Sequence, residues 1–261
     1  MKIIKEFLPP ILIRKLTGLF YGWSGNYETW NDAQKKAIGY DSEKILKKIE
    51  NALLKVKNGE AVCERDSVLF DKIEYSFPLL SALMTVALEN DKKLNVIDFG
   101  GSLGSTYFQN RLFLNSLDAV SWNIVEQSHF VEKGKELFAD ENLKFYFSIE
   151  DCLKENKPDI IIFSSVLQYI EKPYDLLEEV FKHKTKYIFI DRTAYFSEEE
   201  DRITLQKANP KIYNASYPCW FFNEAHFLEK FKASYDMVFD FTTSDRSNIK
   251  SVFKGFLFRL K

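Results

Sequence analysis

Five short apolar segments, each followed by enough residues for a helix, occupy the centre of the chain. They are LNVIDF (94–99), WNIVE (122–126), LKFYF (143–147), DIIIFSS (159–165) and KYIFID (186–191). Strands that alternate with helices build a parallel sheet with both faces covered. The pattern therefore predicts an α/β fold of the Rossmann type.

The alternation stops after the fifth segment. An aromatic-rich insertion occupies about 192–222, and a helix-like stretch, NEAHFLEKF, precedes two further apolar segments, YDMVFDF (235–241) and GFLFRL (255–260). Only a short polar loop joins these last two segments, so we expect an antiparallel hairpin at the edge of the sheet. The hairpin brings the expected number of strands to seven.

Residues 1–93 lack this alternation and are expected to form an N-terminal helical extension, followed by the sheet domain at 94–261. SEKILKKIENALLKV (42–56) and PLLSALMTVAL (78–88) have helical patterns, and a short amphipathic helix is expected in the segment that begins at Met1 and ends at Phe20. Pro9-Pro10, Arg14 and Lys15 interrupt that first segment, which argues against a signal peptide or a membrane span.

Charge and cysteine content exclude several classes of function. The net charge of −2 provides no general footprint for nucleic acid. The 3 cysteines and 3 histidines have no metal-ligand spacing with one another, so no metal site is expected. An odd number of widely spaced cysteines fits a reducing, cytoplasmic location. The sequence does not determine the oligomeric state.

A glycine-rich turn ends the first predicted strand and leads directly into a helix. It reads Asp98-Phe99-Gly100-Gly101-Ser102-Leu103-Gly104. Glu126 ends the second strand, 22 residues beyond Gly104, close to the ~20-residue spacing at which an acid binds ribose hydroxyls. Turn and acid together predict an adenosine-type ligand, although a tight turn beside a solvated Glu126 is the alternative.

The turn favours S-adenosylmethionine over a dinucleotide. Ser102 breaks the G-x-G-x-x-G template that lets backbone approach a pyrophosphate, and no basic phosphate ligand is nearby. S-adenosylmethionine has no phosphate, and it needs polar groups at its ribose, its adenine and its other flank. Residues after the second, third and fourth strands would supply them: Gln127, Ser148, Ile149, Glu150, Ser164 and Ser165.

Two alternatives to a methyltransferase stay open. An NAD-dependent sugar oxidoreductase or epimerase would use the same fold, but the middle glycine is missing and Tyr169 is followed by Pro173 where a Tyr-x-x-x-Lys pair needs lysine. The second alternative is a non-catalytic subunit with a methyltransferase fold, and the intact glycine-rich turn argues against it.

Motifs along nearly the whole chain carry a family resemblance. They are LPPIL (8–12), YGWSGNYETW (21–30), GYDSEKIL (39–46), ERDSVLFD (64–71), VIDFGGSLGSTYFQNR (96–111), WNIVEQ (122–127), SSVLQY (164–169), DRTAY (191–195) and IYNASYPCW (212–220). The chain resembles class I S-adenosylmethionine-dependent methyltransferases, and specifically a bacterial family of predicted methyltransferases associated with surface-polysaccharide (capsule and lipopolysaccharide) gene clusters.

The resemblance implies a Rossmann-like seven-stranded class I methyltransferase sheet and transfer of a methyl group from S-adenosylmethionine. It places the turn from Asp98 to Gly104 at the methionine end of the cofactor, Glu126 at the ribose and the residues after Phe147 at the adenine. It also implies a small acceptor, such as a nucleotide-linked sugar or a phosphorylated precursor of a surface polysaccharide, and hence an O-methyltransferase. Ser102 departs from the glycine usual at its position, which puts the path of the loop in doubt.

Candidate residues for the acceptor follow the fourth and fifth strands. Asp191 is the first choice for a general base, with a loop cap as its alternative, and Gln168 and Tyr169 would bound the methyl-transfer position. Arg192 is placed to bind an anionic group. Further candidates for substrate binding are Tyr21, Trp23, Arg65, Tyr195, Tyr213, Tyr217 and Trp220, for which core packing, or an ion pair in the case of Arg65, is the alternative.

Overall fold

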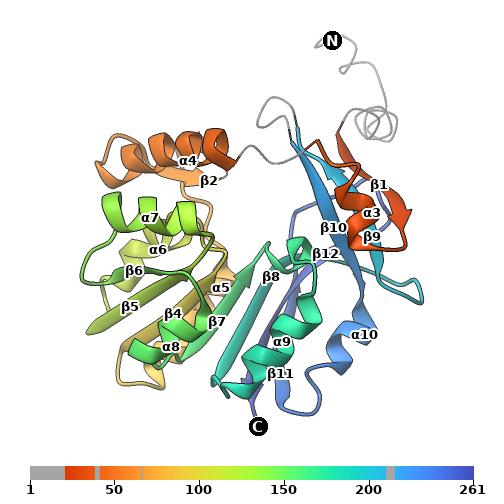
Figure 1. The fold of residues 1–261 in the computed structure, drawn as a ribbon. Helices are drawn as coiled ribbons and strands as arrows, with labels where there is room; N and C mark the ends of the chain where they lie inside the picture. The colour runs from red at the N-terminus through yellow and green to blue at the C-terminus, as the bar shows by residue number, and fades with distance from the viewer. Residues whose placement is uncertain (1–20, 39–41, 66, 210–214) are drawn as a thin grey trace.

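The central feature of the molecule is a twisted sheet of seven strands, seen in a computed structural model that describes residues 21–38, 42–65, 67–209 and 215–261 (Figure 1). In spatial order the strands are β6 (Leu143–Tyr146), β5 (Ala119–Val125), β4 (Lys93–Phe99), β7 (Ile160–Ser164), β8 (Tyr187–Phe196), β12 (Val252–Leu260) and β11 (Tyr235–Thr242). All neighbours up to β8 are parallel, whereas β12 is antiparallel to both β8 and β11. The predicted parallel sheet with an antiparallel C-terminal hairpin is confirmed.

Helices cover both faces of this sheet. The core on one face includes α4 (Ser42–Lys57), α5 (Phe77–Leu88), α6 (Ser105–Leu114) and α7 (Ser128–Leu137). The core on the other face includes α8 (Ile149–Glu155), α9 (Pro173–Lys182) and α10 (Glu224–Glu229). Burial on both sides explains why β7 reads as an uninterrupted apolar run: Ile160 to Phe163 are fully buried.

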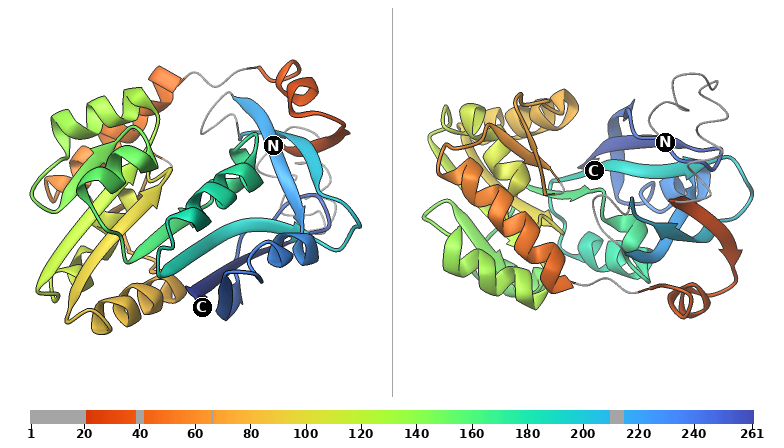
Figure 2. Two further views of the ribbon diagram at one scale, coloured as in Figure 1. Left: turned by 60° about the horizontal axis from the view of Figure 1, so that its bottom comes forward. Right: turned by 90° about the horizontal axis from the view of Figure 1, so that it is seen from above.

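Three further strands extend the sheet beyond β8. They are β10 (Ser216–Asn223), β9 (Arg202–Lys207) and β1 (Gly22–Tyr27), paired antiparallel in that order, and β10 runs parallel to the last residues of β8. Figures 1 and 2 show β1, drawn in red, beside the much later strands β9 and β10. Strand β1 of the N-terminal segment and strands β9 and β10 of the predicted insertion therefore form one continuous extension of the sheet.

The N-terminal segment is less helical than the sequence indicates. Besides α4 and α5 it contains a short helix, α3 (Trp30–Gln34), the strand β1, and a hairpin of β2 (Cys63–Arg65) and β3 (Val68–Phe70). Local periodicity does not reveal β1, because its pairing partner β9 lies in a distant part of the chain, beyond β8. A boundary at residue 93 stays a prediction, as does the extent of the insertion at 192–222.

Two expectations fall outside the described residues, namely the amphipathic helix between Met1 and Phe20 and the position of Tyr213. Within the described part of the chain, no helix combines the length and the apolar composition needed to cross a bilayer. Cys63, Cys152 and Cys219 are free and buried.

Candidate functional site

The glycine-rich turn follows β4 at the carboxyl edge of the sheet. Gly100, Ser102 and Gly104 have positive φ angles of 72°, 55° and 104°. A side chain on Gly100 would place its Cβ 2.5 Å from Val166 Cγ2, so this turn packs directly against the loop after β7. Ser102 adopts the left-handed conformation that a glycine would adopt without cost.

The buried side chain of Asp98 packs directly against the turn. Its side chain is 1 % exposed, and Trp122 Nε1 donates a hydrogen bond of 3.1 Å to its Oδ2. Burial raises the pKa of Asp98 to about 7, against the smaller opposing effect of the Trp122 hydrogen bond. A Cβ on Gly101 would lie 2.6 Å from the Asp98 carboxyl carbon, so the turn closes over this group.

Glu126 reaches back from the end of β5 to the same turn. Its Oε2 accepts from the backbone N–H of Gln127 at 2.5 Å, and the backbone N–H of Ser102 also donates to its carboxylate. Burial raises the pKa of Glu126, while these two hydrogen bonds lower it. The structure thus brings together the turn and the acid that the sequence analysis paired.

The residues after β6 are largely committed to local structure. Ser148 caps α8, its Oγ accepting from the backbone N–H of Asp151 at 3.1 Å, and Ile149 is buried in the core. Glu150 is exposed, and so is the neighbouring Phe147, which the sequence analysis did not select. The proposed adenine side therefore offers one acidic and one aromatic side chain.

The loop after β7 and the middle of β8, at Asp191 and Arg192, form a connected polar cluster. The backbone N–H of Ser165 donates to the Asp191 carbonyl at 2.9 Å, and Gln168 Nε2 donates to Ser165 Oγ at 3.2 Å and to the Arg192 carbonyl at 3.3 Å. Arg192 Nη2 lies 3.4 Å from Ser164 Oγ. Asp191 and Gln168, expected near the methyl-transfer position, are both hydrogen-bonded to the backbone of Arg192.

Asp191 is set apart by its surroundings. It is 4 % exposed, and its Oδ1 has no hydrogen-bond partner among the described residues. Burial raises its pKa to about 6, whereas the charge and the backbone N–H of Arg192 lower it. A carboxylate with a pKa in this range accepts a proton readily, which is the property required of a general base near neutral pH.

Tyr169 connects this cluster to the outer sheet. Its hydroxyl donates to Gln206 Oε1 at 2.9 Å, and its ring meets that of Tyr217 edge-on, with the centroids 5.2 Å apart. Gln206 on β9 is paired in register with Trp23 on β1 and with Tyr217 on β10. We call these four half-buried residues, Tyr169, Gln206, Tyr217 and Trp23, the aromatic row. The place of Gln206 between Trp23 and Tyr217 depends on this distant pairing and could not be deduced from the sequence.

One predicted substrate residue is corrected by its position. Tyr195 is 1 % exposed and packs among Phe222, Phe227 and Phe256, because its place in β8 turns the side chain into the core. It is a core residue in this structure and does not face an acceptor. The prediction that it binds substrate is wrong for this conformation.

Two other predicted residues, Trp220 and Arg65, are engaged elsewhere. Trp220 Nε1 donates to the Ile170 carbonyl at 3.0 Å, and its ring stacks on Trp30. Arg65 is exposed and lies over the Phe70 ring, while its neighbour Glu64 is buried and accepts from Ser105 Oγ at 2.5 Å, at the start of α6. Tyr21 is half-buried. Glu64, not Arg65, is therefore the side chain of this strand that contacts the helix following the glycine-rich turn.

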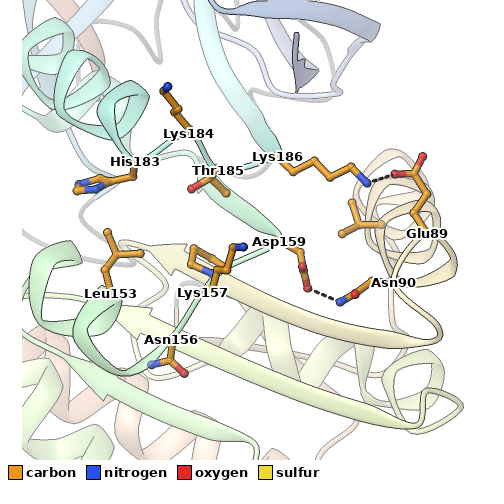
Figure 3. Close-up of a pocket in the computed structure, with 12 residues that line it drawn as sticks. Glu89, Asn90, Leu153, Asn156, Lys157, Asp159, His183, Lys184, Thr185 and Lys186 are labelled. Carbon is orange, nitrogen blue, oxygen red and sulfur yellow. Dashed lines mark hydrogen bonds and ion pairs between the residues drawn. The ribbon is translucent and has the colours of Figure 1, made fainter.

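A cavity of about 530 Å³ lies at the opposite edge of the sheet, near the amino ends of β7 and β8 (Figure 3). Lys186 Nζ pairs with Glu89 Oε2 at 2.7 Å, and Asn90 Nδ2 donates to Asp159 Oδ2 at 3.1 Å. Of the described residues that line it, none belongs to the predicted cofactor or acceptor sets. Its volume alone gives no reason to move the candidate site away from the carboxyl edge.

Comparisons with known proteins identify the fold. No protein-family model and no curated protein sequence matches the chain. Among solved structures, the N-terminal domain of EvdMO1, crystallised in the presence of SAH (S-adenosylhomocysteine) and D-fucose, is similar with a TM-score of 0.50 and 11 % identity, covering 85 % of this chain and 98 % of that chain.

Two further similar structures are methyltransferases. Magnesium protoporphyrin IX methyltransferase (ChlM) from Synechocystis PCC 6803 with bound SAM has a TM-score of 0.46 and 12 % identity over 71 % of this chain and 79 % of that chain. The 1,6-didemethyltoxoflavin-N1-methyltransferase of Burkholderia thailandensis has a TM-score of 0.44 and 12 % identity over 85 % and 92 %. The fold of this chain is the Rossmann-like class I methyltransferase fold.

Proposed function

We propose that the protein transfers the methyl group of S-adenosylmethionine to a small acceptor. The observation that carries the proposal is the clustering of buried oxygen atoms without partners at one edge of a methyltransferase-type sheet. Ser102 Oγ lies in the turn after β4, Gln168 Oε1 lies in the loop after β7, and Asp191 Oδ1 lies within β8 beside the end of β7; none of them has a hydrogen-bond partner among the described residues. Unsatisfied buried polar atoms are costly, so a ligand at this edge would satisfy them.

The residues present fit the cofactor. The turn from Asp98 to Gly104 would surround its methionine end, Glu126 would accept from the ribose hydroxyls, and Phe147 and Glu150 would flank the adenine. When bound, S-adenosylmethionine supplies an electrophilic methyl group on a sulfonium. The role of this chain's residues is to hold the acceptor atom in line behind that methyl group and to receive its proton.

The acceptor is proposed from the family resemblance. A sugar or a phosphate-type group of a bacterial surface-polysaccharide precursor would make the protein an O-methyltransferase, acting in the cytoplasm where nucleotide-linked precursors occur. The half-buried rings of the aromatic row support a ring-shaped acceptor, because aromatic faces with polar tips suit sugar surfaces.

Calorimetric titration with S-adenosylmethionine and S-adenosylhomocysteine tests the cofactor. Glu126→Ala is expected to weaken binding by about tenfold to a hundredfold, since hydrogen bonds to a charged group contribute about 1.5–3 kcal/mol. Glu132→Ala, an exposed change on the helix that follows Glu126, is the matched control and should bind as the wild type does. A folded sample that binds neither ligand, or equal affinities for both variants, would refute the assignment.

A further inference from the structure

The backbone of a single residue, Arg192, holds the two side chains next to the proposed methyl-transfer position. Its N–H donates to the Asp191 carboxylate, and its carbonyl accepts from Gln168 Nε2 at 3.3 Å. Arg192 has a positive φ of 49°, and together with Asp191 it stands opposite Gly255 alone in β12, which makes a β-bulge. Bulges re-aim side chains next to functional sites, and this one brings Asp191 and Gln168 to one place.

The orientation of the Gln168 amide is fixed by chemistry. A carbonyl oxygen only accepts hydrogen bonds, so the end of the amide that faces the Arg192 carbonyl must be the NH₂ group. The other end, Oε1, then points away from that carbonyl. It is buried, in a side chain that is 2 % exposed, and has no partner among the described residues.

Asp191 repeats this arrangement at the other backbone group of the same residue, the Arg192 N–H. Its carboxylate receives the Arg192 N–H, yet Oδ1 is buried without a partner among the residues that the structure describes. The cluster therefore presents two buried hydrogen-bond acceptors, each on a side chain that is hydrogen-bonded to the backbone of Arg192, and leaves both unsatisfied. An unsatisfied buried acceptor is costly unless a donor reaches it.

We propose that the acceptor substrate carries two adjacent neutral hydroxyl groups, as on a sugar ring, one donating to Asp191 Oδ1 and the other to Gln168 Oε1. The proposal rests on the proposed methyltransferase function and chooses among its substrates. A phosphoryl or carboxylate oxygen at these two positions would bring lone pairs, without hydrogens, against two acceptors, one of them charged. An anion would instead be attracted to the Arg192 guanidinium, which lies 3.4 Å from Ser164 Oγ in the same cluster. An oxygen of such a group is therefore disfavoured as the atom that accepts the methyl group.

The same contact defines the proton's path. The hydroxyl oxygen forms a bond to the methyl carbon while the carbon–sulfur bond breaks, and the pair of electrons of that bond stays on sulfur, which becomes a neutral thioether. The hydroxyl proton passes to Asp191 Oδ1. Atoms and charge balance with a methyl ether, S-adenosylhomocysteine and a protonated Asp191 as products.

Nuclear magnetic resonance on the protein saturated with S-adenosylhomocysteine tests the inference. The probes are cis-cyclohexane-1,2-diol, which presents two adjacent hydroxyls and nothing else, and inorganic phosphate. The readout is the side-chain amide resonance of Gln168, assigned by its loss in Gln168→Leu. The diol should shift this resonance in a saturable manner, and phosphate should not.

Asp191→Asn is the decisive variant. The asparagine must keep its oxygen on the Arg192 N–H, so its NH₂ group points toward the ligand and one acceptor becomes a donor. Diol binding should weaken by about tenfold or more. Asp245→Asn is the matched control, because Asp245 is exposed and acts on Asp191 through charge alone, and diol binding should be unchanged.

The wild-type comparison stands even if Asp191→Asn does not fold. Absence of a diol effect, a stronger effect of phosphate, or equal diol binding in Asp191→Asn and the wild type would each overturn the inference. Titration of S-adenosylhomocysteine in the same samples separates the two proposals. Loss of cofactor binding would refute the methyltransferase function, whereas cofactor binding without diol binding would refute only the choice of acceptor.

Discussion

Asp98 is a buried acid whose ionisation opposes folding. Its pKa rises from an ordinary 3.8 to about 7 in the native protein, chiefly through burial. The native state therefore keeps a proton that the unfolded chain releases. The stabilisation linked to this proton is complete below about pH 4 and is lost as the pH rises through 7, with a span of up to about 4 kcal/mol.

Asp98→Asn should remove this pH dependence. The asparagine oxygen can still accept from Trp122 Nε1, so the variant keeps the shape and the hydrogen bond of the native site. The difference in melting temperature, variant minus wild type, is expected to be larger at pH 8 than at pH 5. Asp118→Asn, at an exposed loop position, is the control. If the melting temperatures of the wild type and both variants change with pH in the same way between pH 5 and pH 8, the expectation is contradicted.

Comparison with Gly59 separates the conformational from the steric cost of adding a side chain at Gly100. Their φ angles are similar, at 72° and 78°, but a Cβ on Gly59 meets nothing within 4 Å, whereas one on Gly100 would lie 2.5 Å from Val166 Cγ2. Gly59→Ala should cost at most about 1 kcal/mol, the left-handed strain less the entropy lost by the unfolded chain. Gly100→Ala should cost a further amount of about 1–3 kcal/mol, because Val166 must move.

Urea denaturation measures both glycine variants, and titration with S-adenosylhomocysteine provides a second readout. Displacement of Val166 disturbs the loop that continues to Gln168, so Gly100→Ala should also bind the ligand more weakly, whereas Gly59→Ala should not. Equal losses of stability in the two variants would mean that the contact between the turn and the loop after β7 contributes nothing.

At the scale of elements, the sequence predicts those strands that are buried on both faces. The run Ile160 to Phe163 has no polar residue, which is the pattern that burial between two helical layers favours. The glycine-rich turn and Glu126 were also predictable, because the carboxyl ends of neighbouring parallel strands meet at one edge. Sequence reasoning therefore located the proposed cofactor side of the site.

The elements that were not predicted depend on distant partners. β1, with the sequence GWSGNY, has three exposed residues and becomes a strand by pairing with β9. The bulge in β8 needs Arg192 in a left-handed conformation opposite Gly255, and a Cβ on Gly255 would lie 2.6 Å from the Ile190 carbonyl oxygen. Neither the pairing nor the bulge leaves a periodic signal, so the geometry around Asp191 and Gln168 could come only from the structure.

At the scale of the whole molecule, the proposed cofactor site and the proposed acceptor site lie on two parts of one sheet. The proposed cofactor residues lie on and after β4, β5, β6 and β7, whereas the aromatic row spans β1, β9 and β10 together with Tyr169. Tyr169 directly follows Gln168 in the chain, so the two parts meet beside the unsatisfied acceptors. An N-terminal strand whose partner lies in a distant part of the chain is thus part of the proposed acceptor side.

Trp23 and Trp30 provide a matched test of this division. Both are half-buried in the N-terminal segment and both are packed on other rings. Trp23, a member of the aromatic row, contacts the rings of Phe221 and Phe253, whereas Trp30 stacks on Trp220. Each change to alanine should destabilise the protein by about 2–4 kcal/mol, by comparison with other large-to-small substitutions, and leave the affinity for S-adenosylhomocysteine within about twofold of wild type.

Methyl transfer should distinguish the two tryptophan variants. With radiolabelled S-adenosylmethionine and a pool of neutral glycosides as acceptors, Trp23→Ala should transfer at least about tenfold less label than Trp30→Ala, because loss of an aromatic contact acts on acceptor binding only in the row. Measurements below the melting temperature of both variants remove the effect of stability. If the two lose transfer equally, the row is packing that joins β1 to the body of the protein, and the acceptor must be held by Asp191, Gln168 and their neighbours alone.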